Sequence, residues 1–351
     1  MKLSDYTLGL LADIEKRIIP EVEDDFISQW KSFWNGEAKE LIFHPKRKIV
    51  SNPGIEVRKI NINDAVEDFE LMLASQMEKV NAALVSGRGA LGIRSNYGTG
   101  IMSSLFGAKV FIMPREQNTL PTTMPFDSVD DVKRVLDAGV PDTDNALGSK
   151  VFAFGEFCKE VFKDYPNIEK YVVVYHPDTQ GPLDITELLW GGELFYALYD
   201  DPDLVHETLK LATDTYIKFL DRWFAMYPNR KDMNVHWDFW MKGNICIRDD
   251  SAMNLSPDLY EEFGYKYDKY LLDYYGGGTV HYCGRGDHYI DILTAAPTLT
   301  GINLSQPHLN DMDVIYNAAF TNNKKILSLA PAACDEYEKR ADARPSVVYK
   351  Y

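Results

Sequence analysis

Apolar residues recur every three or four positions over the first part of the chain, which is the spacing of one helix face. The clearest stretch begins at Asn63, whose side chain can cap a helix. The apolar stripe behind it contains Val66, Phe69, Leu73, Met77, Val80 and Leu84. We therefore predict that residues 1–85 form a helical extension, and that its methionines and aromatic residues pack in a core.

After Gly87 the pattern changes to short apolar runs that alternate with helical stretches, which is typical of α/β proteins. Some of these helices have clear starts, such as Asp201-Pro202, where a capping side chain precedes a proline. Eight runs are strand candidates: 90–95, 109–113, 170–176, 234–239, 279–282, 300–304, 325–329 and 346–349. Eight strands with crossover helices predict a (β/α)8 TIM barrel over residues 86–351.

The composition narrows the class of protein. The chain has 351 residues, of which 45% are hydrophobic and 26% charged, as in globular domains. Its net charge of −16 disfavours nucleic acid and anionic membranes as main partners. The four cysteines are too few and too scattered for a disulfide framework, and no apolar run approaches the ~20 residues of a membrane span. The N-terminal segment is amphipathic and acidic, unlike a signal peptide, so we expect a cytoplasmic protein that acts on a small molecule.

Polar residues gather where the predicted strands end, which is where a barrel of this type carries its chemistry. Two of them, His176 and His236, lie within apolar runs, and such histidines are more often hydrogen-bonded core residues. Taken together, however, the set favours an active site over ordinary loop polarity. The catalytic candidates are Arg94, Tyr97, Asp238 and Arg285, and the substrate-binding candidates are Asn96, His176, Gln180, His236, His288, Ser305 and Gln306.

A two-residue spacing suggests a metal site. His281 and Cys283 lie in the stretch TVHYCGRGDHYIDIL, at the end of a predicted strand. In a strand their side chains point to the same face, and imidazole and thiolate together suit zinc. The pair alone is a weak signal, because a zinc ion needs further ligands. The alternative is a buried cysteine beside a hydrogen-bonded histidine.

Four segments carry a resemblance to a known superfamily: GPLDITELLWGGELF at 181–195, NLSPDLYEEF at 254–263, HYCGRGD at 281–287 and GINLSQPHLNDMDVIY at 301–316. Over residues 90–330 the chain resembles the uroporphyrinogen decarboxylase superfamily, which includes zinc-dependent methyltransferases serving corrinoid proteins and coenzyme M. The resemblance implies a (β/α)8 barrel with a deep polar cleft at the strand ends, and a homodimer as in the decarboxylases.

Two family motifs bear on the activity. The decarboxylases carry arginines in a motif of the form RQAGRY, whereas this chain reads GIRSNYGTG with Arg94 alone. The methyltransferases bind zinc through His-x-Cys and a distant third cysteine. This pattern implies His281, Cys283 and Cys334 as metal ligands here, with Asp238 or Glu193 able to complete the set.

The resemblance therefore favours a zinc-dependent methyltransferase working with a separate corrinoid protein, because no B12-binding domain is evident in this chain. One alternative is a cofactor-free decarboxylase of a porphyrinogen-like or other polycarboxylate substrate, in which Arg94, Arg115 and Arg285 bind carboxylates. Another is a corrinoid- or tetrapyrrole-binding protein without catalytic activity.

Overall fold

The computed structural model describes residues 3–230 and 233–350. The helices are α1 (Asp5–Arg17), α2 (Pro20–Trp34), α3 (Ile62–Ala65), α4 (Phe69–Ser86), α5 (Ile101–Leu105), α6 (Val129–Ala138), α7 (Leu147–Phe162), α8 (Pro166–Tyr171), α9 (Pro182–Trp190), α10 (Leu194–Asp200), α11 (Pro202–Met226), α12 (Pro257–Leu259), α13 (Lys266–Tyr274), α14 (Ile290–Thr294), α15 (Met312–Thr321) and α16 (Pro331–Tyr337). The strands are β1 (Ile42–Phe43), β2 (Gly92–Ile93), β3 (Val110–Phe111), β4 (Thr122–Thr123), β5 (Val173–Val174), β6 (Met233–His236), β7 (Phe239–Lys242), β8 (Ile245–Arg248), β9 (Gly278–Tyr282), β10 (Leu299–Leu304), β11 (Lys325–Leu329) and β12 (Val347–Tyr349).

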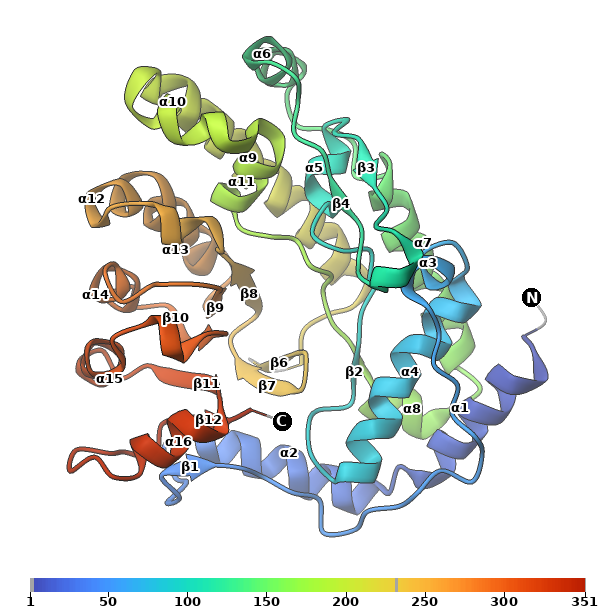
Figure 1. Ribbon diagram of the computed structural model, residues 1–351. Helices are drawn as coiled ribbons and strands as arrows, with labels where there is room; N and C mark the ends of the chain where they lie inside the picture. Colours follow the sequence, from blue (N-terminus) through green and yellow to red (C-terminus); the bar gives the residue numbers. More distant parts are fainter. Residues whose placement is uncertain (1–2, 231–232, 351) are drawn as a thin grey trace.

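Six parallel strands form the main sheet, in the order β1-β12-β11-β10-β9-β8. They follow one another along a curved wall, with α14 and α15 on its outer side (Figure 1). In this sheet Arg248 lies opposite His281, and His281 lies opposite Asn303. The register therefore places three polar side chains in one row near the C-terminal ends of neighbouring strands. The predicted α/β architecture with a parallel sheet is confirmed.

Strands β2 and β5 form a second parallel pair, which is not part of the main hydrogen-bonded ladder. Hydrogen bonds from residues that flank these two strands connect the pair to both edges of the main sheet. On one side the Gly181 amide donates to the Arg248 carbonyl oxygen at 2.5 Å, and the Cys246 amide donates to His176 Nε2 at 3.2 Å. On the other side the Arg47 amide donates to the Gly87 carbonyl oxygen at 2.8 Å. Over the described residues, the backbone hydrogen bonds between parallel strands therefore do not continue from the main sheet to β2 and β5. At β8 the His176 side chain, instead of a backbone carbonyl group, accepts from the Cys246 amide.

Two of the expected strands take no part in the parallel sheet. The run at 109–113 is reduced to β3, which pairs antiparallel with β4. The run at 234–239 is broken at Trp237, which has a φ of +51°, so that β6 and β7 form an antiparallel hairpin. Strands β8 and β1 occupy the sheet instead. The three residues that open β8, Ile-Cys-Ile, are fully buried, and burial of this short apolar run explains its place in the wall.

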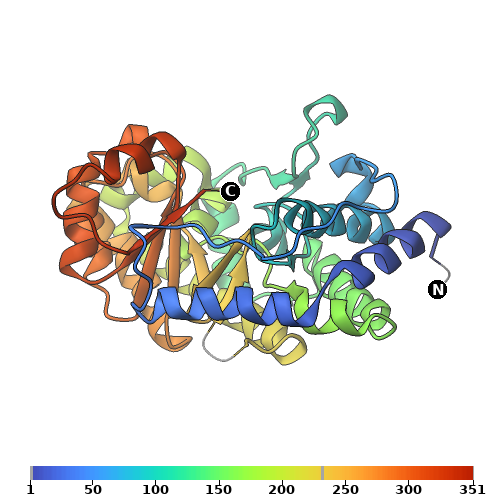
Figure 2. The same ribbon diagram turned by 90° about the horizontal axis from the view of Figure 1, so that it is seen from below.

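The N-terminal region is integrated into the fold. Helix α2 runs across the strands, close to the first residues of β10 and β11 (Figure 2). Its aromatic residues Phe26, Trp30 and Phe33 are fully buried in one cluster with side chains of β6, β11 and β12. The Trp34 indole donates to the Trp240 carbonyl oxygen at 2.7 Å. The segment between α2 and α3 is not helical, and its strand β1 joins the main sheet, so residues 1–85 are more than a helical extension.

The predicted stripe of α4 packs as expected, with Leu73, Met77 and Val80 fully buried. The cap of this helix is Asp68, five residues later than the predicted Asn63, and its side chain accepts a hydrogen bond from the Leu71 amide at 3.0 Å. Asn63 itself lies within the short helix α3. Among the described residues, no helix has both the length and the apolar character needed to cross a membrane.

Candidate metal centre and active site

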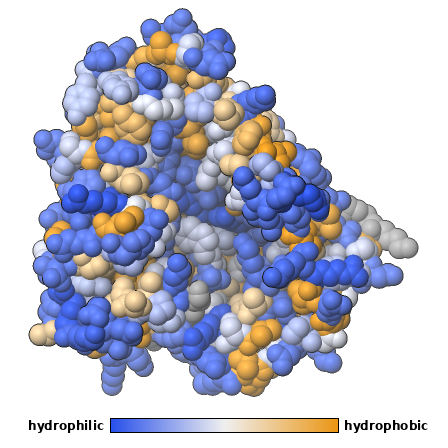
Figure 3. Space-filling model, viewed as in Figure 1, coloured by the Kyte–Doolittle hydropathy of each residue, from blue (hydrophilic) through white to orange (hydrophobic). Residues whose placement is uncertain are grey.

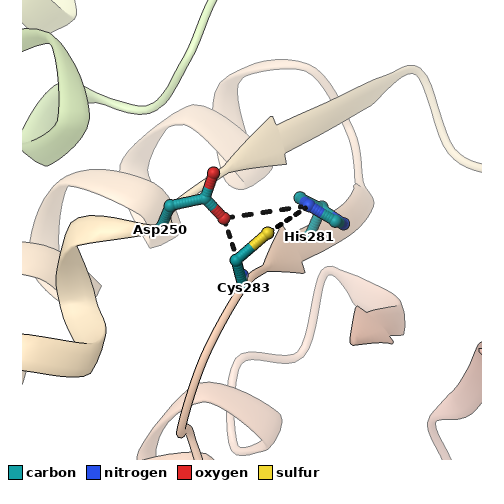
Figure 4. A group of neighbouring side chains, drawn as sticks. All are labelled: Asp250, His281 and Cys283. Carbon is teal, nitrogen blue, oxygen red and sulfur yellow. Dashed lines mark hydrogen bonds and ion pairs between the residues drawn. The ribbon is translucent and has the colours of Figure 1, made fainter. Parts of the chain in front are cut away.

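Three side chains with metal-binding atoms meet at the C-terminal ends of β8 and β9. His281 and Cys283 leave β9 on one face, while the buried Tyr282 between them points to the other. Asp250 is the second residue after β8. His281 Nε2 lies 3.5 Å from Cys283 Sγ and 3.7 Å from Asp250 Oδ1, and the three ligand atoms all lie within 4.8 Å of one another. Figure 4 shows the carboxylate, imidazole and thiol converging on one point.

The hydrogen bonds of Asn303 determine which histidine nitrogen faces this point. The Asn303 amide nitrogen donates to the Leu327 carbonyl oxygen at 3.4 Å, so its Oδ1 faces His281. His281 Nδ1 lies 2.5 Å from that oxygen and must therefore carry the proton and donate it. Nε2 is left with a free lone pair directed at Asp250 and Cys283. This arrangement, with the second ring nitrogen held by an amide or carboxylate oxygen, is typical of histidines that bind metals.

The other two side chains are also held in place. The Cys283 amide donates to Asp250 Oδ1 at 2.6 Å, and Cys283 Sγ lies 3.5 Å from Ser305 Oγ. The next amide, of Gly284, donates to Gln306 Oε1 at 2.5 Å. Burial raises the pKa of the Cys283 thiol to about 11, with the Asp250 carboxylate adding to the effect. Cys283 is thus a thiol at neutral pH unless a cation stabilises the thiolate.

The three residues fit a zinc ion. Zinc binds sulfur at about 2.3 Å and nitrogen or oxygen at about 2.0–2.2 Å, so ligand atoms of a tetrahedral site lie about 3.3–3.7 Å apart. The distances of 3.5 Å and 3.7 Å from His281 Nε2 fall in that range, and the Asp250 and Cys283 ligand atoms lie within 4.8 Å of each other. Burial lowers the pKa of His281, which keeps the imidazole neutral and able to coordinate. Three protein ligands leave one position of a tetrahedral ion for a substrate.

A second polar group lies beside these ligands. The Arg248 guanidinium is only 2% exposed, and its Nε lies 3.0 Å from Asp178 Oδ1. Arg94 approaches the other oxygen of Asp178 at 3.4 Å and donates to Asn96 Oδ1 at 2.8 Å. The Gln180 amide also donates to Asp178. Burial would raise the pKa of Asp178, but Arg248 and then Arg94 lower it below its usual value. Two arginines against one carboxylate leave one positive charge in excess.

Two buried histidines pack beside this charged group. The rings of His176 and His236 are 4.2 Å apart, and His236 also contacts Trp237, whose ring lies 5.0 Å from that of His281. Burial lowers the pKa of His176 to about 3 and that of His236 well below its usual value, so both are neutral. His176 is a hydrogen-bonded core histidine that joins β5 to β8. Neither nitrogen of His236 has a partner among the described residues.

The structure does not bring the remaining candidates to the metal ligands. Tyr97 is buried in the hydrophobic core, where burial raises the pKa of its hydroxyl, and that hydroxyl has no partner among the described residues. Asp238 lies at the tip of the β6–β7 hairpin and lines a separate pocket with Lys79. Cys334 lies in the first turn of α16, and its thiol donates to the Leu329 carbonyl oxygen at 3.4 Å. It is outside the ligand group.

Two further candidates lie in the loop after β9. Arg285 is exposed and pairs with Asp287 at 2.6 Å, while His288 Nε2 lies 2.9 Å from the Leu255 carbonyl oxygen. The Arg285 contact stays within the loop, whereas the His288 contact reaches the segment after η3 (Ser251–Asn254). Glu193 is exposed on the short 3-10 turn η2 (Gly191–Glu193). None of the three belongs to the group of Asp250, His281 and Cys283, although only Glu193 was expected as a metal ligand.

The predicted site omits three residues of the centre, although all three are among the polar residues near the ends of the predicted strands. Asp250 completes the ligand group, Arg248 carries the buried positive charge, and Asn303 orients the histidine. The sequence contains a local indication for the first two, because the charged residues Arg248-Asp249-Asp250 come directly after the apolar run Ile245-Cys246-Ile247. In the view of Figure 3 the surface is hollowed near its centre, and hydrophilic residues gather in the hollow.

Comparisons with known proteins bear on the fold. No family model matches the sequence, and no curated protein is significantly similar to it in sequence. A solved structure of a methyltransferase from Methanosarcina mazei is similar, with a TM-score of 0.58 and 14% sequence identity. The alignment covers 92% of this chain and 91% of that chain. At this level of identity the likeness shows that the two chains share a fold over nearly their whole length.

Proposed function

We propose that this protein is a zinc-dependent methyltransferase that moves a methyl group between a corrinoid on a separate protein and a small thiol. The observation that carries the proposal is the group of Asp250, His281 and Cys283, whose ligand atoms lie within 4.8 Å of one another. The fold shared with a methyltransferase supports it. For the fold itself, we infer that β2 and β5 complete an eight-position ring with the main sheet, as a (β/α)8 barrel requires.

Each residue of the site would have a separate role in metal binding. Asp250, His281 and Cys283 would hold the ion, and Asn303 would keep His281 Nε2 free to bind it. A bound zinc ion would supply a Lewis acid that keeps the substrate thiol as a thiolate at neutral pH. In the proposed reaction the substrate sulfur would take the methyl group, the electron pair of the cobalt–carbon bond would stay on cobalt, and the thiol proton would pass to solvent.

The charges beside the ligands favour an acidic substrate. Arg94 and Arg248 share the single carboxylate of Asp178, and both are largely excluded from water. A carboxylate or sulfonate on the substrate would balance the excess positive charge, since charge-assisted bonds to arginine are strong in a buried site. Gln180 and Asn96, which already contact this group, would be additional binding residues.

The same two arginines support one alternative, a decarboxylase of a polycarboxylate that needs no metal. The alternatives differ in their response to a chelator. The purified protein would be mixed with methylcobalamin and either 3-mercaptopropionate or the uncharged 2-mercaptoethanol. The proposal predicts loss of methylcobalamin with the acidic thiol, slower loss with the uncharged thiol, and none after zinc is removed. Turnover that survives chelation would contradict it, and so would the absence of any transfer by the zinc-loaded protein.

A further inference from the structure

One carboxylate behind the ligand group contacts the backbone rather than the ligand atoms. Asp184, in the first turn of α9, is only 3% exposed. Its Oδ2 accepts a hydrogen bond from the Asp250 amide at 3.0 Å, and its Oδ1 accepts one from the Ser251 amide at 2.7 Å. The two amides begin the short 3-10 turn η3 (Ser251–Asn254). Asp184 lies in the segment 181–195 that carries the family resemblance, but its partners are 66 and 67 positions away, so no local pattern indicates this role.

Helix α9 is itself fixed against the end of β8. The Gly181 amide, just before α9, donates to the Arg248 carbonyl oxygen at 2.5 Å. A Cβ atom at Gly181 would lie 2.8 Å from that oxygen, so only glycine allows this approach. Near the other end of α9, Glu187 accepts a hydrogen bond from the Ser251 hydroxyl. Asp184 therefore lies on a helix that is attached to the end of β8 at two points, one before Asp184 at Gly181 and one after it at Glu187.

From these contacts we infer that Asp184 is a positioning residue for the metal ligand Asp250. Asp184 fixes the backbone of Asp250 from behind, and the Cys283 amide fixes its carboxylate from the front at 2.6 Å. Between these two restraints the Asp250 oxygen stays 3.7 Å from His281 Nε2, in reach of one ion. Without Asp184, two amides lose their acceptor, and the residues after β8 are free to rotate the Asp250 carboxylate away.

This inference rests on the proposed metal site but adds a residue that touches neither metal nor substrate. A purely structural role would be different: Asp184 would stabilise the η3 turn and the fold without affecting how Asp250 binds an ion. The visible spectrum of bound Co²⁺ distinguishes the two roles, because its bands depend on the number and geometry of the metal ligands. A structural role would lower the melting temperature and leave those bands in place.

The test compares zinc affinity and the Co²⁺ spectrum in wild type, Asp184→Asn, Asp184→Ala and Thr186→Val. Thr186 is a matched control, since it is buried on the same helix and its hydroxyl donates only within the helix, to the Pro182 carbonyl oxygen at 2.8 Å. Residues that hold metal ligands in place typically change metal affinity about 10–100-fold. We expect a loss of that size in Asp184→Ala, a smaller loss in Asp184→Asn, altered Co²⁺ bands in both, and wild-type behaviour in Thr186→Val.

Other outcomes are equally decisive. If wild type and both Asp184 variants bind zinc equally and give the same Co²⁺ bands, the positioning role is refuted while the metal site stands. If wild type itself binds no metal, the proposed function fails and the inference fails with it. Asp184→Asn keeps the shape of the side chain and one acceptor oxygen, so it decides the question even if Asp184→Ala does not fold.

Discussion

Replacing Asn303 with leucine removes the group that sets the tautomer of His281. Asn303 is 4% exposed, and its Oδ1 lies 2.5 Å from His281 Nδ1. In Asn303→Leu the Nδ1 proton has no acceptor, and leaving a buried donor unpaired costs about 1–3 kcal/mol. The imidazole can avoid this by moving its proton to Nε2, where the Asp250 carboxylate lies 3.7 Å away. That tautomer no longer presents a lone pair to the metal.

The expected loss of zinc affinity is about 10–100-fold, which corresponds to about 1.4–2.8 kcal/mol. Competition with a chromogenic chelator measures it, with Asn303→Asp as the matched control. The aspartate keeps an acceptor for the Nδ1 proton, so its affinity should equal or exceed that of wild type. Equal affinities for wild type and Asn303→Leu would refute the assignment of Nε2 as the ligand atom.

Three further predictions concern the fold and the rejected ligand. Arg47 and Glu23 form a buried ion pair, with both side chains under 5% exposed. Arg47→Met leaves the Glu23 charge buried without a partner, so it should lower the free energy of unfolding, measured in urea, by about 3–5 kcal/mol. Adding Glu23→Leu to that variant removes the unpaired charge and should restore much of the loss. A double variant as unstable as the single one would count against this. Burial raises the pKa of Asp268 to about 7 from 3.8, so the folded state holds the proton more tightly and stability should fall as pH rises from about 4 to about 7. Asp268→Asn should make that fall smaller, although the buried Asp249 and Asp184, whose pKa values burial also raises, should keep part of it. Parallel urea profiles of the two proteins would show that Asp268 does not contribute. Cys334→Ser should leave zinc binding unchanged, and loss of zinc in that variant would return Cys334 to the ligand set.

Local periodicity was sufficient to predict the class of fold. The alternation of strands and helices after Gly87 predicted the parallel sheet, and the two-residue spacing of His281 and Cys283 predicted that they share a face. Both patterns arise from the geometry of a single element. The runs at 109–113 and 234–239 were misassigned to the sheet, because strand propensity does not specify which partner a strand pairs with.

The rest of the site depends on contacts between elements. Asp250 reaches His281 because Arg248 and His281 are in register between β8 and β9. Strand β8 has only four residues and follows β7 after a two-residue turn. Its short apolar run was therefore not predicted as a separate strand. Cys334 was selected because the family pattern implies a distant third cysteine, but the first turn of α16 directs its thiol to the Leu329 carbonyl oxygen just before that helix. Spacing along the chain contains none of this information.

Metal content after dialysis against zinc tests the central claim most directly, in wild type, Cys283→Ser and Asp250→Asn. The ligand group predicts close to one zinc per chain in wild type and its loss in Cys283→Ser. Asp250→Asn should weaken binding, since a neutral amide replaces a charged oxygen ligand. Wild-type protein that retains no zinc would contradict the account. So would a Cys283→Ser variant that retains as much zinc as wild type.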